Sequence, residues 1–105
     1  MMTYQIVLSA LVDPTRRAVF ESLLGGEQTV GQLAKTHQVS GPAISQHLKV
    51  LREAELAHMR AEGTRNMYSI NREGLRCLKT YLDGFWSDAL GAYHNEIERR
   101  NNEGY

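Results

Sequence analysis

The sequence predicts a mainly helical protein with one small β-hairpin, and three observations support this fold class. Apolar residues recur at three- and four-residue spacing over most of the chain, which is the period of amphipathic helices. Between residues 56 and 71 the period changes to two around a central glycine, which indicates two strands joined by a tight turn. With 105 residues, 42% of them hydrophobic, the chain can form one modest core. We therefore expect a single domain over residues 1–105.

Two short helices are expected first. One covers residues 3–11, with Tyr4, Val7, Leu8 and Leu11 on one side. Asp13 is a good N-cap and Pro14 suits a first helical position, so a second helix begins there. It ends near Leu24, before two glycines, and should bury Ala18, Val19 and either Ser22 or Leu23.

Residues 29–54 predict two helices around a tight turn. Thr29 and Gln32 match a capping box, so a helix should begin there and run to about His37. After a turn at residues 38–39, Ser40 caps the next helix, which tolerates Pro42 in its first turn. The inward residues expected are Val30, Leu33 and Ala34 in the first of these helices, and Ile44, Leu48 and Leu51 in the second.

Residues 56–71 predict the hairpin, with Gly63 in its turn and Arg60 and Arg65 flanking its tip. Asn71 should cap a long last helix over residues 72–99. Its apolar stripe is too long for a small head to cover, so a second subunit is expected to bury it, with folding back onto the same chain as the alternative. The stripe consists of Leu75, Leu78, Leu82, Phe85, Trp86, Ala89, Leu90, Tyr93 and Ile97.

Four helices, a hairpin and a final helix make a winged helix-turn-helix, a shape suited to placing one helix in a DNA groove. The formal net charge of zero conceals a local excess that fits this partner. Residues 35–79 hold eight basic and four acidic residues, net +4, whereas residues 80–105 are net −3 and residues 1–34 net −1. Attraction to phosphates depends on the local field, so a neutral total does not argue against DNA.

Other classes of protein are disfavoured. No apolar run approaches the roughly 18 residues of a membrane span. The N-terminus lacks the basic start of a signal peptide, so we expect a cytoplasmic protein. The single cysteine, Cys77, excludes an intramolecular disulfide and is interpreted as a small apolar side chain. No nucleophile–base pair, phosphate loop or metal triad appears at a workable spacing, so no enzyme is expected.

The chain also resembles a known family. VSGPAISQHLKVLREAELA, followed by EGTRNMYSI, is similar to the helix-turn-helix and wing of the ArsR/SmtB family of winged-helix repressors. ALVDPTRRAVFESLL is similar to that family's second helix, and YLDGFWSDALGAYHNEIE resembles the SdpR-like branch, which lacks an obvious metal site. The likeness covers about Leu8 to Asn71 by motif, and the last helix by length and position.

This resemblance implies a homodimeric repressor that binds double-stranded DNA. The first and last helices would form the dimer interface, and the helix after Ser40 would lie in the major groove. The wing would touch flanking backbone or the minor groove. A two-fold dimer would bind a pseudo-palindrome with half-sites about 34 Å apart, and occupation of a promoter would block polymerase.

Within that frame, each candidate residue receives a role. Ala43, Ser45 and Gln46 are expected to contact bases, because glutamine pairs with adenine, serine donates or accepts, and alanine can meet a thymine methyl. The residues expected at the DNA backbone or in the wing are Thr29, Ser40, His47, Lys49, Arg60 and Arg65. Those expected at the dimer interface are Tyr4, Leu8, Leu78, Leu82, Phe85, Trp86, Ala89, Tyr93 and Ile97.

Some assignments stay open at this level. His47 could reach a phosphate or pack against the preceding helix, and Arg16 and Arg17 could form a salt bridge or face DNA. No metal or other cofactor is expected, since the helix at residues 30–37 has no cysteine and His94 and Glu98 supply only two ligands. Aspartates of a second subunit could complete that site in a metal-responsive repressor. A protein-interaction module without DNA binding is the other alternative.

Overall fold

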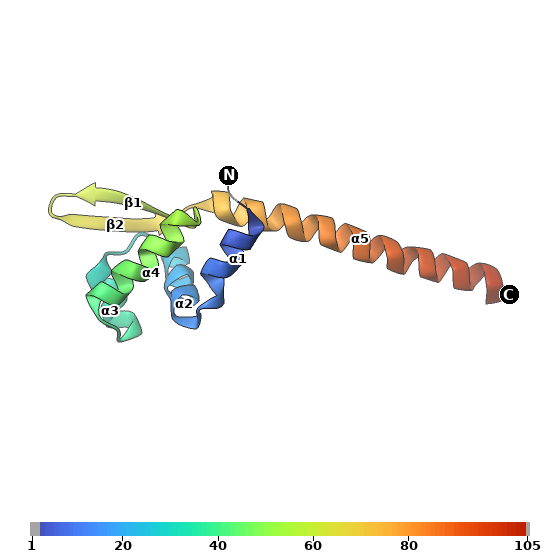
Figure 1. The fold of residues 1–105 in the computed structure, drawn as a ribbon, viewed down its shortest axis with the longest axis horizontal. Coiled ribbons are helices and arrows are strands. Elements are labelled where there is room, and N and C mark those ends of the chain that lie inside the picture. The colour runs from blue at the N-terminus through green and yellow to red at the C-terminus, as the bar shows by residue number, and fades with distance from the viewer. Residues whose placement is uncertain (1–2, 105) are drawn as a thin grey trace.

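The computed structural model describes residues 3–104, and for residues 92–96 and 98–104 the backbone alone. The elements follow the expected order (Figure 1). They are α1 (Tyr4–Val12), α2 (Pro14–Ser22), a 3₁₀ turn η1 (Leu23–Gly25), α3 (Val30–His37), α4 (Gly41–Glu53), β1 (Ala57–Glu62), β2 (Arg65–Ile70) and α5 (Arg72–Gly104).

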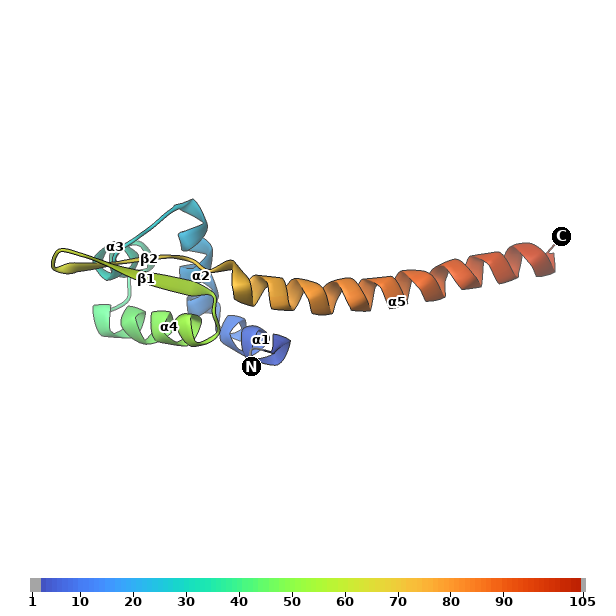
Figure 2. The same cartoon turned by 90° about the horizontal axis from the view of Figure 1, so that it is seen from above.

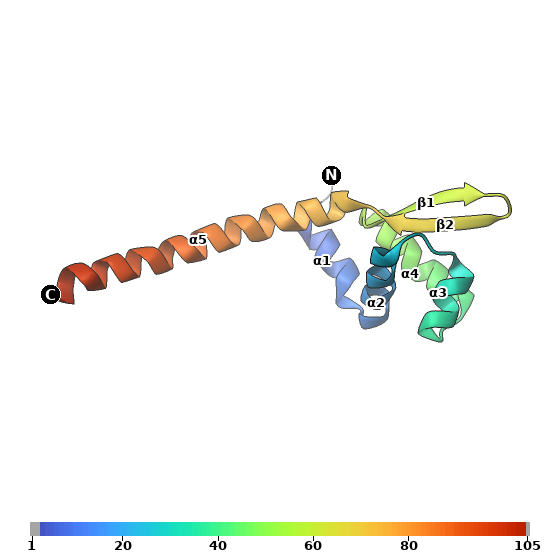
Figure 3. The ribbon, with the colours of Figure 1, turned by 180° about the vertical axis from the view of Figure 1, so that it is seen from behind.

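The molecule consists of a head and a rod. The head is formed by α1 to α4 and the hairpin, while α5 leaves it as one long helix, so the whole measures 71 × 28 × 21 Å (Figures 1 and 3). Seen from above, the hairpin extends beside α4 (Figure 2). The hairpin tip and the N-terminal end of α4 both lie at the end of the molecule away from α5.

The core lies between the helices of the head and the base of the hairpin. The expected stripe of α4 is confirmed, since Ile44, Leu48 and Leu51 are completely buried. In α2 the structure buries Val19 and also Phe20, which the sequence pattern did not single out, and Leu23 is buried in η1. Ala18, which was expected in the core, is half-buried. The largest fully buried side chains are Leu33, Ile44, Leu48, Leu51, Leu56, Val7 and Val19.

The junction of α1 and α2 explains the two adjacent arginines. The last carbonyls of a helix have no partner within the helix. Here the Arg16 Nε donates to the carbonyl of Ala10, and the Arg17 Nη1 donates to that of Leu11 at 3.0 Å. Asp13 caps α2 by accepting the Arg16 N–H at 2.9 Å. The two cations therefore complete the C-terminal end of α1, which outweighs their unfavourable place in the first turn of α2.

The start of α5 is packed against the turn that joins α4 to β1. The Asn71 side chain accepts the Glu73 N–H at 3.0 Å, which confirms the expected cap. The Gly74 N–H donates to the Glu55 carbonyl at 2.8 Å, and a Cβ on Gly74 would lie 2.6 Å from the Ala54 carbonyl oxygen. Only glycine allows this approach, so Gly74 fixes where α5 begins relative to the head.

Further along, Tyr4 of α1 stacks on Tyr81 of α5, with ring centroids 3.8 Å apart and planes within 10°. This stacking covers one face of each ring and removes apolar area from water. Gly74 and the tyrosine pair together set the direction in which α5 leaves the head.

Gly74→Ala should lower the free energy of unfolding by about 1–3 kcal/mol, because the added methyl overlaps two backbone carbonyls that cannot move independently. Urea denaturation followed by circular dichroism measures this change. Gly84→Ala is the matched control, since a Cβ at that position of α5 meets nothing. It should stabilise the helix by about 0.5–1 kcal/mol. Equal effects of the two substitutions would contradict the packing argument.

The cap at Asp13 predicts a pH dependence. Its hydrogen bond from the Arg16 N–H holds the pKa of the carboxyl below its ordinary 3.8, so the charged cap stabilises the fold above that pH. The contribution is lost as the pH falls through the lowered pKa of the folded protein. The stability difference between the wild type and Asp13→Asn, measured by denaturation across acidic pH, should therefore be constant near neutrality and change below pH 3.8. A difference that is independent of pH would contradict this role.

Candidate nucleic-acid interface

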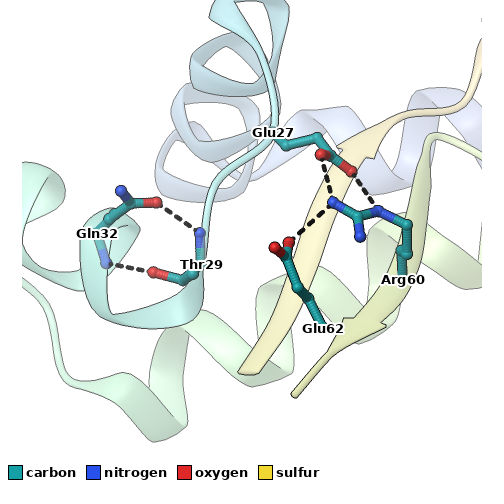
Figure 4. Close-up of polar contacts among 5 residues, drawn as sticks. All are labelled: Glu27, Thr29, Gln32, Arg60 and Glu62. Carbon is teal, nitrogen blue, oxygen red and sulfur yellow. Dashed lines mark hydrogen bonds and ion pairs between the residues drawn. The ribbon is translucent and has the colours of Figure 1, made fainter. Parts of the chain in front are cut away.

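The two helices of the helix-turn-helix begin at side-chain caps. Gln32 N–H donates to the Thr29 hydroxyl at 3.2 Å, and the Thr29 N–H donates to the Gln32 side-chain oxygen at 2.8 Å, completing the capping box (Figure 4). The Ser40 hydroxyl accepts the Ala43 N–H at 3.2 Å. Between them, Gln38 ends α3 in the left-handed conformation with φ 54°. Local sequence therefore determines where both helices start, as predicted.

The buried stripe of α4 leaves a polar face toward solvent. Ser45, Gln46 and Lys49 are exposed and Ala43 is half-buried. The side chains of Ser45, Gln46 and Lys49 make no hydrogen bond or ion pair within the part of the chain that the structure describes. Their donors and acceptors are thus free to bond an external partner.

His47 lies at the edge of this face and is half-buried. Its Nδ1 is buried without a hydrogen-bond partner among the described residues. The predicted contact of this side chain with phosphate stays a prediction.

The wing is a two-stranded antiparallel hairpin with Glu62 opposite Arg65. Two residues form its turn, and the first, Gly63, has φ +61°, as two-residue hairpin turns with a leading glycine require. Strand β2 starts at Arg65, directly after this turn. Arg65 is exposed and has no ion pair within the described residues.

Arg60 differs from Arg65, because its guanidinium is paired with two carboxylates of the same chain. Its Nε and Nη2 donate to the two carboxylate oxygens of Glu27 at 3.2 and 2.8 Å, and Nη2 also reaches Glu62 at 3.0 Å (Figure 4). This hydrogen bonding lowers the pKa of Glu27 and raises that of Arg60. Arg60, which was expected at the DNA backbone or in the wing, thus belongs to a network of three charges. Local sequence could not reveal this network because Glu27 lies 33 residues away.

The residue after Glu27 forms an isolated β-bridge to the wing. Gln28 and Tyr68 exchange two backbone hydrogen bonds, of 2.9 and 2.8 Å. The Gln28 side chain also donates to the Ser22 carbonyl at 2.7 Å. Residues 27–29, which we call the connecting segment, therefore bind the wing and also begin α3. Of these three residues, only Thr29 had a role predicted from the sequence.

A second candidate surface runs along α5. Three of its side chains are 56–59% exposed, namely Phe85, Trp86 and Leu90. Two more on α5, Leu82 and Ile97, are about 40% exposed, as is Leu8 on the neighbouring α1. Leu78 is half-buried, Ala89 is exposed, and Tyr4 is engaged by Tyr81 of its own chain. The predicted interface residue Tyr93 lies outside the described side chains. An open groove of about 1000 Å³ adjoins this face, with apolar walls from Leu23, Leu24, Ile70, Leu75, Leu78, Leu82 and Trp86.

The described residues contain no cluster of three or more His, Cys, Asp or Glu side chains that could hold a metal ion. The alternative site at His94 and Glu98 lies outside the described side chains. Cys77 is half-buried in α5. Among the helices of the described part, none combines the length and the apolar character needed to cross a membrane.

Comparison with known proteins identifies this arrangement. Residues 13–58 match the sequence model described as "Bacterial regulatory protein, arsR family". The chain is 49% identical over 89 residues to the HTH-type transcriptional regulator Rv2034 of Mycobacterium tuberculosis, covering 85% of this chain and 83% of that protein. It is 40% identical over 65 residues to the transcriptional repressor SdpR of Bacillus subtilis, covering 62% and 72%.

A solved structure extends the likeness to three dimensions. The solution structure of the homodimeric winged helix-turn-helix DNA-binding domain of Mb0332 from Mycobacterium bovis, a possible ArsR-family regulator, aligns with a TM-score of 0.64 at 27% identity. The alignment covers 80% of this chain and 77% of that one. The expected winged helix-turn-helix is thereby confirmed.

Proposed function

This chain belongs to the arsR family of bacterial regulatory proteins, and on that premise we propose that it is a homodimeric repressor that binds a pseudo-palindromic operator. The family consists of DNA-binding transcriptional regulators, so the chain is a regulator and not an enzyme. The finer claims concern its oligomeric state, the DNA it binds and the residues that bind it. In a bacterial cell such a protein would work in the cytoplasm, where transcription takes place.

One observation carries the proposal: an unoccupied polar helix face and an exposed wing lie at the same end of the molecule. The fourth helix, α4, would enter the major groove, with Ser45 and Gln46 bonding base edges and Ala43 meeting a thymine methyl. Lys49 lies on the same exposed side and would pair with phosphate. The side chains of Thr29 and Ser40 serve as caps, and the helix N-termini beside them are suited to phosphate oxygens.

The partner proposed for α5 is a second copy of the chain. A row of exposed aromatic and aliphatic side chains extending beyond the head is costly in water. The printed description of the Mycobacterium bovis relative as homodimeric supports the same occupant. Residues 72–104 of α5, together with α1, would then form the dimer interface, and residues 30–70 the DNA-binding part. Two such parts related by a two-fold axis would contact half-sites about 34 Å apart, and a promoter covered in this way would be closed to polymerase.

Selection of bound duplexes from a random-sequence library would test this directly, and the selected site then serves as the probe for variants. Gln46→Ala should weaken binding to it by about 1–3 kcal/mol and relax preference at one position of each half-site. Lys49→Ala is the matched comparison. It should weaken all duplexes alike and reduce the salt slope by about 2 per dimer, because each protomer loses one phosphate contact. Absence of any duplex preferred over random DNA at low salt would refute the proposal.

The dimer is tested separately by Trp86→Glu, which should raise the dimer dissociation constant at least roughly tenfold, because a charge would be placed in an apolar contact. Sedimentation equilibrium measures this. Ser87→Glu is the control, since the next residue along the helix is turned about 100° away from the apolar stripe. If both variants dimerise like the wild type, α5 is not the interface.

A further inference from the structure

The connecting segment, residues 27–29, joins three parts of the head. Gln28 bonds to β2 through its backbone and to the end of α2 through its side chain. Thr29 opens α3 through its capping box. Glu27 adds an ion pair to the opposite strand, β1 (Figure 4). The orientation of the wing relative to the helix-turn-helix is therefore set over a very short stretch of chain.

Most of the wing has little else to hold it. Every residue of β1 after Ala57 is exposed, and in β2 only Tyr68 is buried. The backbone pairing of Gln28 fixes β2 at Tyr68, but it does not reach β1, which pairs with the other side of β2. The Arg60 side chain reaches from β1 across to Glu27, so it ties the outer strand to the connecting segment.

The geometry of this pair is of the kind that contributes even near the surface. The guanidinium uses two nitrogens toward two carboxylate oxygens, and a third charge, Glu62, joins the network. Isolated exposed ion pairs contribute little, whereas bidentate arginine–carboxylate pairs and networks are the exceptions. We expect the network of Arg60 with Glu27 and Glu62 to act mainly on the position of the wing.

The same network also separates the two arginines of the wing. Glu62 lies directly opposite Arg65 in the strand register, where opposite charges ordinarily pair. Its carboxylate instead bonds Arg60 at 3.0 Å, and Arg65 has no ion pair among the described residues. Arg60 thus satisfies two carboxylates and leaves the cation at the tip available.

We propose that Arg60 is a positioning residue: held by Glu27, it fixes the angle of the wing and keeps Glu62 from neutralising Arg65, which is the cation of the wing that contacts phosphate. This rests on the proposed DNA binding by the wing. It assigns a function in DNA binding to Glu27, an acidic residue that faces no DNA itself.

The direction in which Glu27→Gln changes DNA affinity decides whether Glu27 positions the wing. Removing a negative charge near a DNA-binding surface ordinarily tightens binding, because phosphates are repelled less. If Glu27 positions the wing through Arg60, Glu27→Gln should instead weaken binding to the selected duplex, by roughly tenfold, and Arg60→Gln should weaken it by a similar factor. The double variant should be no worse than either single one, because both remove the same contact.

Salt dependence and a conservative variant separate positioning from direct contact. Arg65→Gln should reduce the salt slope by about 2 per dimer, and adding Arg60→Gln to it should reduce the slope no further, because Arg60 acts only through the phosphate contact of Arg65. Arg60→Lys keeps the charge but loses the bidentate geometry, so it should behave like Arg60→Gln. Glu53→Gln, which removes an exposed carboxylate of α4 without an ion pair in the described part, is the control and should not weaken binding.

The proposal is overturned if Glu27→Gln binds as tightly as the wild type or tighter, or if the variant carrying both Arg60→Gln and Arg65→Gln has a clearly smaller salt slope than Arg65→Gln alone. Hydrogen exchange of the free protein gives an independent test. Amides of residues 57–70 should exchange faster in Glu27→Gln at unchanged global stability, and unchanged exchange overturns the positioning role. Failure of the wild type to prefer any duplex would refute the proposed function instead. The hydrogen-exchange result would still show whether the ion pair between Glu27 and Arg60 holds the wing.

Discussion

The complete burial of one stripe of α4 determines the direction of its exposed face, which is the proposed DNA-binding surface. Ile44, Leu48 and Leu51 have no exposed surface, so α4 cannot rotate about its axis without bringing apolar side chains into water. Because side chains on a helix are separated by about 100°, this fixes the direction of every other residue on it. Ser45, Gln46 and Lys49 are exposed as a consequence of what lies behind them. The packing of one side of α4 in the core thus determines which residues lie on its other side, where DNA binding is proposed.

A second constraint acts through the connecting segment. The wing is too exposed to be held by a core, so its position depends on polar contacts: two backbone hydrogen bonds at Gln28 and the charge network around Arg60. Polar contacts near water are weaker and more adjustable than buried apolar ones. In the proposed complex with DNA, a rigid helix would carry specificity and an adjustable hairpin would carry a positioning contact.

The long helix α5 has the opposite character. Its first turns are fixed by the close approach of Gly74 to the α4–β1 turn and by the stacking of Tyr4 on Tyr81. Beyond them, the apolar side chains that the structure describes on α5 stay largely exposed. The distance between two DNA-binding parts in a dimer would therefore be determined by how rigidly α5 leaves the head. In the proposed dimer, one glycine and one aromatic pair, remote from the polar face of α4, would therefore influence the spacing of half-sites.

Local sequence determined the elements that depend on neighbouring residues: the capping box at Thr29, the caps at Ser40 and Asn71, the glycine turn of the hairpin, and the apolar period that buries α4. These signals act within a few residues, so the fold class, the family and the candidate base contacts followed from them. Only the tertiary structure decided the contacts between distant segments, which include Arg60 with Glu27, Gln28 with Tyr68, Tyr4 with Tyr81, and Gly74 with the α4–β1 turn. Arg60 and Arg65 look alike in the sequence. They differ because folding brings a carboxylate from 33 residues away to one of them and leaves the other in solvent.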